Sequence, residues 1–224
     1  MLQVPALSHP EASVMDGLPR HRVSHCPWPA FPAAPATHFA IAHDGSAILL
    51  KFFVDEDNPR VTCTKPNDPV YKDSCVEFFI SFDNGGSYYN MEWNAAGVCL
   101  MMHGPSREDR TPLTPELIRT IGFDAAGTAA GTGTASPGNA SPGNASPGNA
   151  SPGNASPGWS LELHILTSLF IHDKPITLSG MRATANFYKC GDDCPEPHYL
   201  AWNNIPTPAP DFHQPRYFGE LVFL

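Results

Sequence analysis

Short stretches in which apolar and polar residues alternate recur along most of the chain, and they constrain its fold more than any other feature. Clusters of Gly, Pro, Asn or Asp bound each stretch, as is typical of antiparallel strands. We predict strands at residues 47–54, 74–82, 88–94, 159–166, 182–189, 198–202 and 218–223. One short helix is expected near residues 115–121, with Thr114 as its cap and Pro115 in its first turn. Seven or more strands without alternating helices indicate an all-β fold, an antiparallel β-sandwich or jelly roll.

Composition narrows the class of protein further. Proline accounts for 25 of the 224 residues, about twice its usual share, which disfavours long helices. Lys plus Arg is 13 against 22 Asp plus Glu, so the formal charge is 13 − 22 = −9, the wrong sign for a nucleic-acid partner. The sequence contains no run of about 18 apolar residues, and residues 1–16 lack a basic start and an apolar block. We therefore expect no membrane span, no intact secretory signal and a cytoplasmic protein, or an extracellular one if the start is truncated.

The segment 125–158 differs from the rest of the chain. Ser-Pro-Gly-Asn-Ala occurs four times in succession from residue 136 to residue 155, and the segment has no hydrophobic side chain larger than Ala. Such a tract cannot offset its ordering entropy by burial, so we expect a mobile loop between two strands. We predict an N-terminal extension at 1–17 and a single β-sandwich domain at 18–224, which the 125–158 low-complexity loop interrupts.

The six cysteines, at positions 26, 63, 75, 99, 190 and 194, do not form the dense framework of a disulfide-stapled domain. Free thiols are expected. Only Cys190 and Cys194 lie close in sequence, and their spacing is not that of a zinc knuckle, which also needs a second pair. We interpret them as turn cysteines, with or without a local disulfide.

Period-two sorting divides the strands into a core face and a polar face. The predicted core side chains are Val76, Phe78, Ile80, Phe82, Tyr89, Met91, Trp93, Trp159, Leu161, Leu163, Ile165, Ala183, Ala185 and Phe187. The opposite face carries carboxylates, amides, one Arg and an aromatic ring, but no Lys, at Glu77, Asn90, Glu92, Asn94, Glu162, His164, Arg182, Thr184, Asn186 and Tyr188. These groups make directed hydrogen bonds, so we hypothesise a concave site for a polyhydroxylated ligand. An ordinary solvated face with local ion pairs is the alternative.

The stretch 198–213 places aromatic and His side chains in a proline-stiffened segment that includes Trp202, Phe212 and His213. Sugars stack their C–H faces on aromatic rings while carboxylates, amides and Arg bind their hydroxyls. This segment and the polar face together supply both kinds of group. The alternative is that Trp202 and Phe212 cover one end of the sandwich core.

Five motifs, in this order along the chain, resemble a known family: Tyr71-Lys-Asp-Ser-Cys-Val-Glu77, Tyr-Tyr-Asn-Met-Glu-Trp-Asn-Ala-Ala-Gly at 88–97, Trp159-Ser-Leu-Glu-Leu, Ala-Asn-Phe-Tyr-Lys-Cys-Gly-Asp-Asp at 185–193, and Pro-Asp-Phe-His-Gln-Pro-Arg-Tyr-Phe-Gly-Glu-Leu at 210–221. Together they are similar to the family 9 carbohydrate-binding modules, particularly the small stand-alone members of bacteria. The resemblance extends from about residue 18 to residue 224, apart from the repeat tract.

The resemblance implies a β-sandwich that grips a sugar, often at a chain end, between two aromatic rings. It implies binding without catalysis, in modules usually attached to xylanases and related glycoside hydrolases. The family's platform aromatic and sugar-binding Glu fall on Tyr71 and Glu77, and its second aromatic falls on Phe212. The family's platforms are usually Trp, whereas this chain has Tyr and Phe. Members can also hold structural calcium, for which the acidic residues after strand 47–54, Asp55 and Asp57, are candidates.

We therefore predict a non-catalytic domain that binds an oligosaccharide or polysaccharide of the xylan or cellulose type and serves carbohydrate catabolism, with a glycoside hydrolase as its partner. The predicted ligand-binding residues are Tyr71, Glu77, Asn90, Glu92, Arg182, Asn186, Tyr188, Trp202, Phe212 and His213; no cofactor other than calcium is expected. One alternative is a glycoside hydrolase or lyase that uses Glu77, Glu92 and Glu162 as its carboxylates. The other is an intracellular scaffold or sensor that has lost the sugar site.

Overall fold

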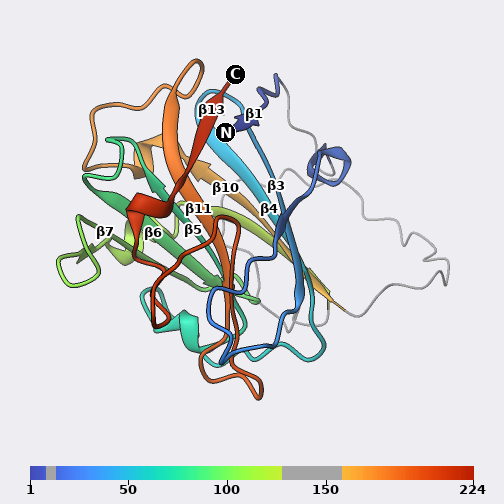
Figure 1. Ribbon diagram of the computed structural model, residues 1–224. Coiled ribbons are helices and arrows are strands. Elements are labelled where there is room, and N and C mark those ends of the chain that lie inside the picture. Colours follow the sequence, from blue (N-terminus) through green and yellow to red (C-terminus); the bar gives the residue numbers. More distant parts are fainter. Residues whose placement is uncertain (9–13, 128–157) are drawn as a thin grey trace, which may run out of the picture.

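The computed structural model describes residues 1–8, 14–127 and 158–224, and it shows an all-β sandwich of two sheets (Figure 1). The larger sheet has the order β1 (Leu2–Val4), β13 (Gly219–Phe223), β11 (Arg182–Cys190), β5 (Cys75–Ser81), β6 (Tyr88–Asn94), β7 (Cys99–Gly104) and β8 (Thr111–Pro112), and β12 (Tyr199–Ala201) also pairs with β11. The smaller sheet has the order β2 (His21–Val23), β3 (Ala36–His43), β4 (Ala47–Asp55), β10 (Trp159–Leu166) and β9 (Gly122–Gly127). The predicted fold class is confirmed.

Short helical turns connect the strands: η1 (Val14–Gly17), η2 (Val70–Lys72), α1 (Pro115–Ile118), η3 (Thr167–Leu169) and η4 (Pro215–Tyr217). The predicted short helix is present, although it ends three residues earlier than expected, and the Thr114 side chain accepts a hydrogen bond from the backbone N–H of Leu117. In the described part of the chain, no helix has both the length and the apolar character needed to cross a membrane.

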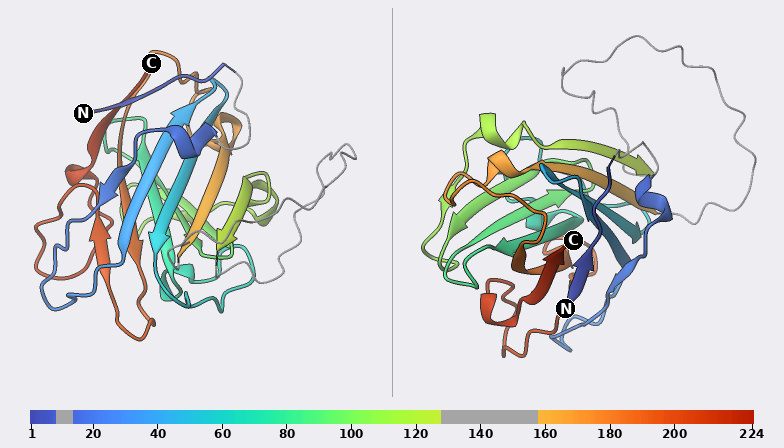
Figure 2. Two further views of the ribbon diagram at one scale, coloured as in Figure 1. Left: turned by 90° about the vertical axis from the view of Figure 1, so that its right-hand side faces the viewer. Right: turned by 90° about the horizontal axis from the view of Figure 1, so that it is seen from above.

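The main core lies between the two sheets, which Figure 2 shows as two layers. Phe187 of β11 stacks on Phe39 of β3, with ring centroids 3.7 Å apart, and on Phe78 of β5, with centroids 4.8 Å apart. All three rings are fully buried. Each such side chain contributes about 1.5–3 kcal/mol by burial, so this stack contributes strongly to the cohesion of the two sheets. The predicted core face of each strand points into this space.

All seven predicted strands are present, but the pattern missed β1, β2, β3, β7, β8 and β9. β3 was missed because both of its faces are covered. Its Ala40 and Ala42 pack beneath Met15 of η1, while Phe39 and Ile41 face the main core. A strand buried on both faces shows no alternation of apolar and polar residues.

The N-terminal segment is not a separate extension, which corrects the predicted division at residue 17. Leu2 and Val4 of β1 are buried in the main core, and β1 pairs in parallel with β13, where Leu2 lies opposite Leu221. The two chain ends therefore lie side by side (Figure 1). A three-residue strand that pairs with the other end of the chain leaves no local pattern to detect.

The start of the predicted low-complexity loop is also corrected, because residues 125–127 belong to β9. Gly127 of β9 lies opposite Trp159 of β10, so the tract connects two antiparallel neighbours in one sheet. The four repeats themselves lie outside the described residues.

The face of the larger sheet that points away from the main core is buried too. Loops cover it and form a second apolar cluster, which includes Trp28, Val70, Phe79, Tyr88, Leu100, Tyr188, Ile205 and Phe212. Consequently β5, β6 and β11 are buried on both faces. Polar side chains on this second face lie in apolar surroundings.

We predict that replacing Phe187 with Ala lowers the free energy of unfolding by about 3–5 kcal/mol, because a cavity opens in the middle of the aromatic stack. Chemical denaturation with a fluorescence or circular-dichroism readout measures this change. Ile171→Ala serves as the control: this side chain is 52% exposed, so the change should stay within about 0.5 kcal/mol. Equal effects of the two variants would contradict the described core.

Candidate functional site

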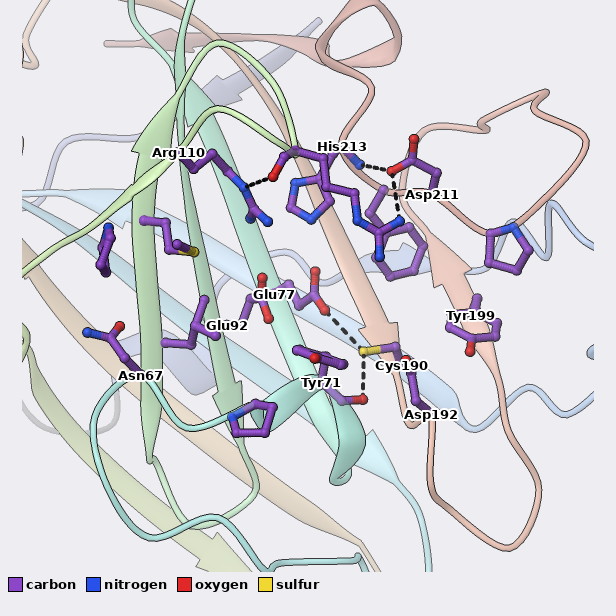
Figure 3. Close-up of a pocket in the computed structure, with 17 residues that line it drawn as sticks. Asn67, Tyr71, Glu77, Glu92, Arg110, Cys190, Asp192, Tyr199, Asp211 and His213 are labelled. Carbon is purple, nitrogen blue, oxygen red and sulfur yellow. Dashed lines mark hydrogen bonds and ion pairs between the residues drawn. The ribbon is translucent and has the colours of Figure 1, made fainter.

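A cavity of about 510 Å³ lies on the outer face of the larger sheet, within the loops that cover it (Figure 3). Strands β5, β6, β7 and β11 form its floor and η2 forms one wall. The loop between β7 and β8, the segment 210–213, and Asp192 with Tyr199 form the others. The volume falls within the range of about 300–1,000 Å³ that is typical of small-molecule sites.

Two carboxyl groups lie next to each other on the floor of this cavity. Glu77 of β5 and Glu92 of β6 are directly opposite in the antiparallel register (Figure 3). Each is less than 5% exposed. The Cys190 thiol donates to Glu77 Oε1 at 3.0 Å, and the Asn90 amide donates to Glu92 Oε1 at 2.9 Å. Among the described residues, Glu92 Oε2 has no hydrogen-bond partner although it is buried. A ligand donor could satisfy it.

Burial controls the ionisation of this pair. It raises the pKa of Glu77 well above its ordinary value, and the neighbouring Cys190 and Glu92 add to the effect. It also raises the pKa of Glu92 to about 7, although the nearby Arg110 guanidinium and the Asn90 hydrogen bond act in the opposite direction. The floor therefore presents carboxyl groups that can both donate and accept hydrogen bonds near neutral pH.

Aromatic rings lie at two walls of the cavity. Tyr71, on η2, is 37% exposed. Asp73, just after η2, fixes this turn because it accepts the backbone N–H groups of Thr62 and Cys63, both at 2.8 Å. On another wall lies Phe212.

Phe212 is held from behind by Tyr188 of β11. The two rings stack with centroids 4.2 Å apart at an angle of 8°, and the Tyr188 hydroxyl donates to the Phe212 carbonyl at 3.1 Å. Tyr188 is fully buried, so it supports the cavity wall without reaching the cavity itself. The Phe212 ring is thus fixed before any ligand arrives.

His213, beside Phe212, also lines the cavity. Its backbone N–H donates to Asp211 Oδ1 at 3.0 Å, and its Nδ1 lies 3.0 Å from the Tyr88 hydroxyl. Burial, together with the charges of Arg110 and Arg107, lowers the pKa of His213 to about 2. The imidazole is therefore a neutral hydrogen-bonding group.

The pattern missed two cations that line the cavity, Arg107 and Arg110. Arg110 Nε donates to the Arg107 carbonyl at 2.9 Å, and Arg107 Nη1 lies 3.9 Å from Asp211 Oδ1. The second contact links the β7–β8 loop to the segment 210–213. Both arginines come from a loop, where strand periodicity gives no signal. Asp192, in the loop that follows β11, was missed for the same reason, and Tyr199, the first residue of the short strand β12, was missed as well.

Of the ten predicted ligand-binding residues, five line the cavity: Tyr71, Glu77, Glu92, Phe212 and His213. Asn90 and Tyr188 lie behind it and position Glu92 and Phe212. Asn186 is buried, and its amide binds the backbone N–H and carbonyl of Asn203, which fixes a loop.

Arg182 and Trp202 lie elsewhere, which corrects their predicted place in the site. Arg182 is at the other end of β11 from Cys190, where it pairs with Glu220. Trp202 packs against Phe39 and Phe187 at the main core, as the alternative interpretation held.

The predicted polar face is in fact two faces. Glu162 and His164 lie on β10 of the smaller sheet, where Glu162 pairs with Lys51 at 3.2 Å. The main core separates them from Glu77 and Glu92. A catalytic group made of all three glutamates is therefore excluded by the geometry.

The candidate calcium ligands do not form a cluster. Asp55 and Asp57 are exposed, and within the described ranges they belong to no group of three thiol, imidazole or carboxylate ligands gathered within 4.8 Å. Glu56, between them, turns inward and pairs with the fully buried ammonium of Lys189 at 3.3 Å. Glu56 also accepts the Trp159 indole N–H at 3.0 Å. A side-chain cation already neutralises Glu56, the one partly buried acid of this turn, so these residues do not fit a calcium site.

A β-sandwich with a polar, aromatic-walled cavity on the outer face of one sheet defines a ligand-binding module. The model of carbohydrate-binding family 9 matches residues 8–127 and 148–223, and the chain belongs to this family. It is similar, with 29% identity and a TM-score of 0.80, to a presumed carbohydrate-binding protein from Bacteroides uniformis, over 100% of this chain and 97% of the other.

Family 9 carbohydrate-binding modules from Caldicellulosiruptor kristjanssonii share the fold. Their structures in complex with glucose and with cellotriose both show 14% identity and a TM-score of 0.59. The matches cover 100% and 99% of this chain, and 95% and 92% of those chains, respectively. No curated protein matches the chain significantly.

We predict that His213 makes the stability of the protein depend on pH. Its folded pKa is lowered to about 2, whereas an unfolded His has a pKa of about 6.5. Below about pH 6.5 the unfolded state binds a proton that the folded state does not, so the free energy of unfolding falls by up to about 1.4 kcal/mol per pH unit. In His213→Asn this contribution is lost, and the slope between pH 7.5 and pH 5.5 should be shallower than in the wild type.

Denaturant unfolding at several pH values measures both slopes. His198, whose pKa is also lowered by burial, contributes equally to both proteins and therefore cancels in the comparison. Identical slopes would contradict the prediction, because they would show that His213 has the same pKa in the folded and unfolded states.

Proposed function

We propose that this protein binds carbohydrate without catalysis, and that the ligand occupies the cavity above Glu77 and Glu92. The observation that carries the proposal is the buried Glu92 Oε2, which lacks a partner within the described structure and lies on the floor of an aromatic-walled cavity. A buried acceptor without a partner costs about 1–3 kcal/mol, and a sugar hydroxyl would remove that cost. Tyr71, which is 37% exposed, and Phe212, which is 9% exposed and has one face stacked on Tyr188, line the same cavity, and we propose that these rings contact the C–H groups of the sugar.

We propose further that the ligand is the end of a glucose- or xylose-based chain. The contact between Arg107 and Asp211 joins two of the cavity walls, the β7–β8 loop and the segment 210–213, and this is our reason for proposing a chain end over the middle of a chain. Support for the sugar class comes from the family 9 modules in complex with glucose and cellotriose, which share this fold. A role in carbohydrate catabolism beside a glycoside hydrolase is consistent with such a ligand.

We predict that gluco- and xylo-oligosaccharides raise the melting temperature of the wild type, because a ligand that binds only the folded state stabilises it by mass action. Tyr71→Ala and Phe212→Ala should each weaken binding by about 10-fold, since one stacking contact contributes on the order of 1 kcal/mol. Calorimetry gives the affinities. Phe123→Ala is the matched control, because this ring is 46% exposed on the other sheet and should not affect binding.

If Phe123→Ala lost as much affinity for the sugar as Tyr71→Ala and Phe212→Ala, the sugar would not bind at the cavity. If no sugar stabilises the wild type, the proposal fails, and the interpretation as a scaffold or sensor takes its place.

We predict that Glu92→Gln weakens sugar binding by about 10- to 100-fold, the usual effect of losing a hydrogen bond to a charged acceptor. Glu162→Gln removes a carboxylate on the other sheet and should bind as the wild type does. The same proteins distinguish binding from hydrolysis in an assay with chromogenic glycosides. Wild-type turnover that disappears in Glu77→Gln or Glu92→Gln would identify a hydrolase instead.

A further inference from the structure

Two thiols and a carboxyl group meet at the end of the cavity floor nearest Tyr71. Cys75 and Glu77 stand two residues apart on β5, so their side chains share one face, and Cys190 of β11 lies directly opposite Cys75 in the antiparallel register. The two Sγ atoms and a Glu77 carboxylate oxygen all lie within 4.8 Å of one another. All three side chains are buried, and both cysteines are free thiols in the described structure.

The dimensions of this group match those of a metal site. Tetrahedral Zn²⁺ has Zn–S distances of about 2.3 Å and Zn–O distances of about 2.0–2.2 Å, which place its ligand atoms about 3.5–3.8 Å apart. Cys190 Sγ lies 3.0 Å from Glu77 Oε1, so a shift of about 0.5 Å would admit the ion. Thiolate ligands select thiophilic ions such as Zn²⁺ over calcium or magnesium.

The remaining position of a tetrahedron would open toward the cavity. Glu77 and Cys190 line the cavity (Figure 3), whereas Cys75 is fully buried and is not among the lining residues, so an ion among the three would be reached from the cavity side. Glu92, directly opposite Glu77, has the buried Oε2 for which the described residues provide no partner. That oxygen can accept a hydrogen bond from a water molecule on the ion.

We propose that Cys75, Glu77 and Cys190 form a binding site for one thiophilic divalent cation, best matched by Zn²⁺, with an open coordination position facing the cavity. Binding replaces the two S–H protons and the Glu77 carboxyl proton with three bonds to the metal, and the three protons pass to solvent. The site does not depend on carbohydrate binding, and its test uses no sugar. Failure of one proposal therefore leaves the other standing.

The test is calorimetric titration of reduced, metal-free protein with Zn²⁺. We expect one ion per chain. Cys75→Ser and Cys190→Ser should each weaken binding at least about 100-fold, because loss of even an outer-shell partner of a metal typically costs about 10- to 100-fold. Glu77→Gln should weaken it by about 10-fold or more. Cys99→Ser, a buried thiol elsewhere, and Cys26→Ser, an exposed one, are the matched controls and should bind as the wild type does.

Cd²⁺ gives a second measurement that needs no variant. Thiolate-to-cadmium charge transfer in the wild type should have the intensity expected for two thiolates, which keeps the proposal falsifiable even if Cys75→Ser does not fold. Unchanged affinity in both Cys190→Ser and Glu77→Gln would overturn the proposal, and so would the absence of the Cd²⁺ band. A disulfide between Cys75 and Cys190 that persists in reductant would overturn it as well.

Discussion

The stacking of Phe187 between Phe39 and Phe78 holds the two sheets together, and the rest of the structure depends on it. Because side chains alternate along a strand, a β11 that places Phe187 in the core must present Tyr188 and Cys190 on the opposite face. The same constraint applies to β5, where Phe78 in the core fixes Glu77 on the other side. The core thereby determines the composition of the cavity floor.

Loops then turn this second face into an apolar environment. Trp28, Ile205 and Phe212 cover it, so the polar groups that remain are removed from most of the solvent. Desolvation disfavours charge, which is why the Glu77 and Glu92 carboxyls have raised pKa values. Such groups are suited to directed hydrogen bonds with a neutral polyhydroxylated ligand. The same loops bury the thiols of Cys75 and Cys190, the residues that form the proposed metal site with Glu77.

Periodicity was informative wherever a strand has one polar and one apolar face. It placed Glu77 and Glu92 on the face opposite Phe78 and Met91, and the structure confirms that sorting. It could not tell which sheet a polar face belongs to, so it grouped Glu162 with glutamates that lie across the core. Nor could it find cavity residues in loops, such as Arg110, because a loop has no repeating pattern.

The sequence by itself determined the all-β class, seven of the strands, the inward face of each and the resemblance to family 9 carbohydrate-binding modules. These properties are local or lie in short motifs, and so a single chain displays them. Only the tertiary structure decided which strands are neighbours and which loops close over the sheet. That arrangement brings Cys75 next to Cys190 and encloses Glu92, and it depends on contacts between residues more than 100 positions apart, such as the Cys190–Glu77 hydrogen bond.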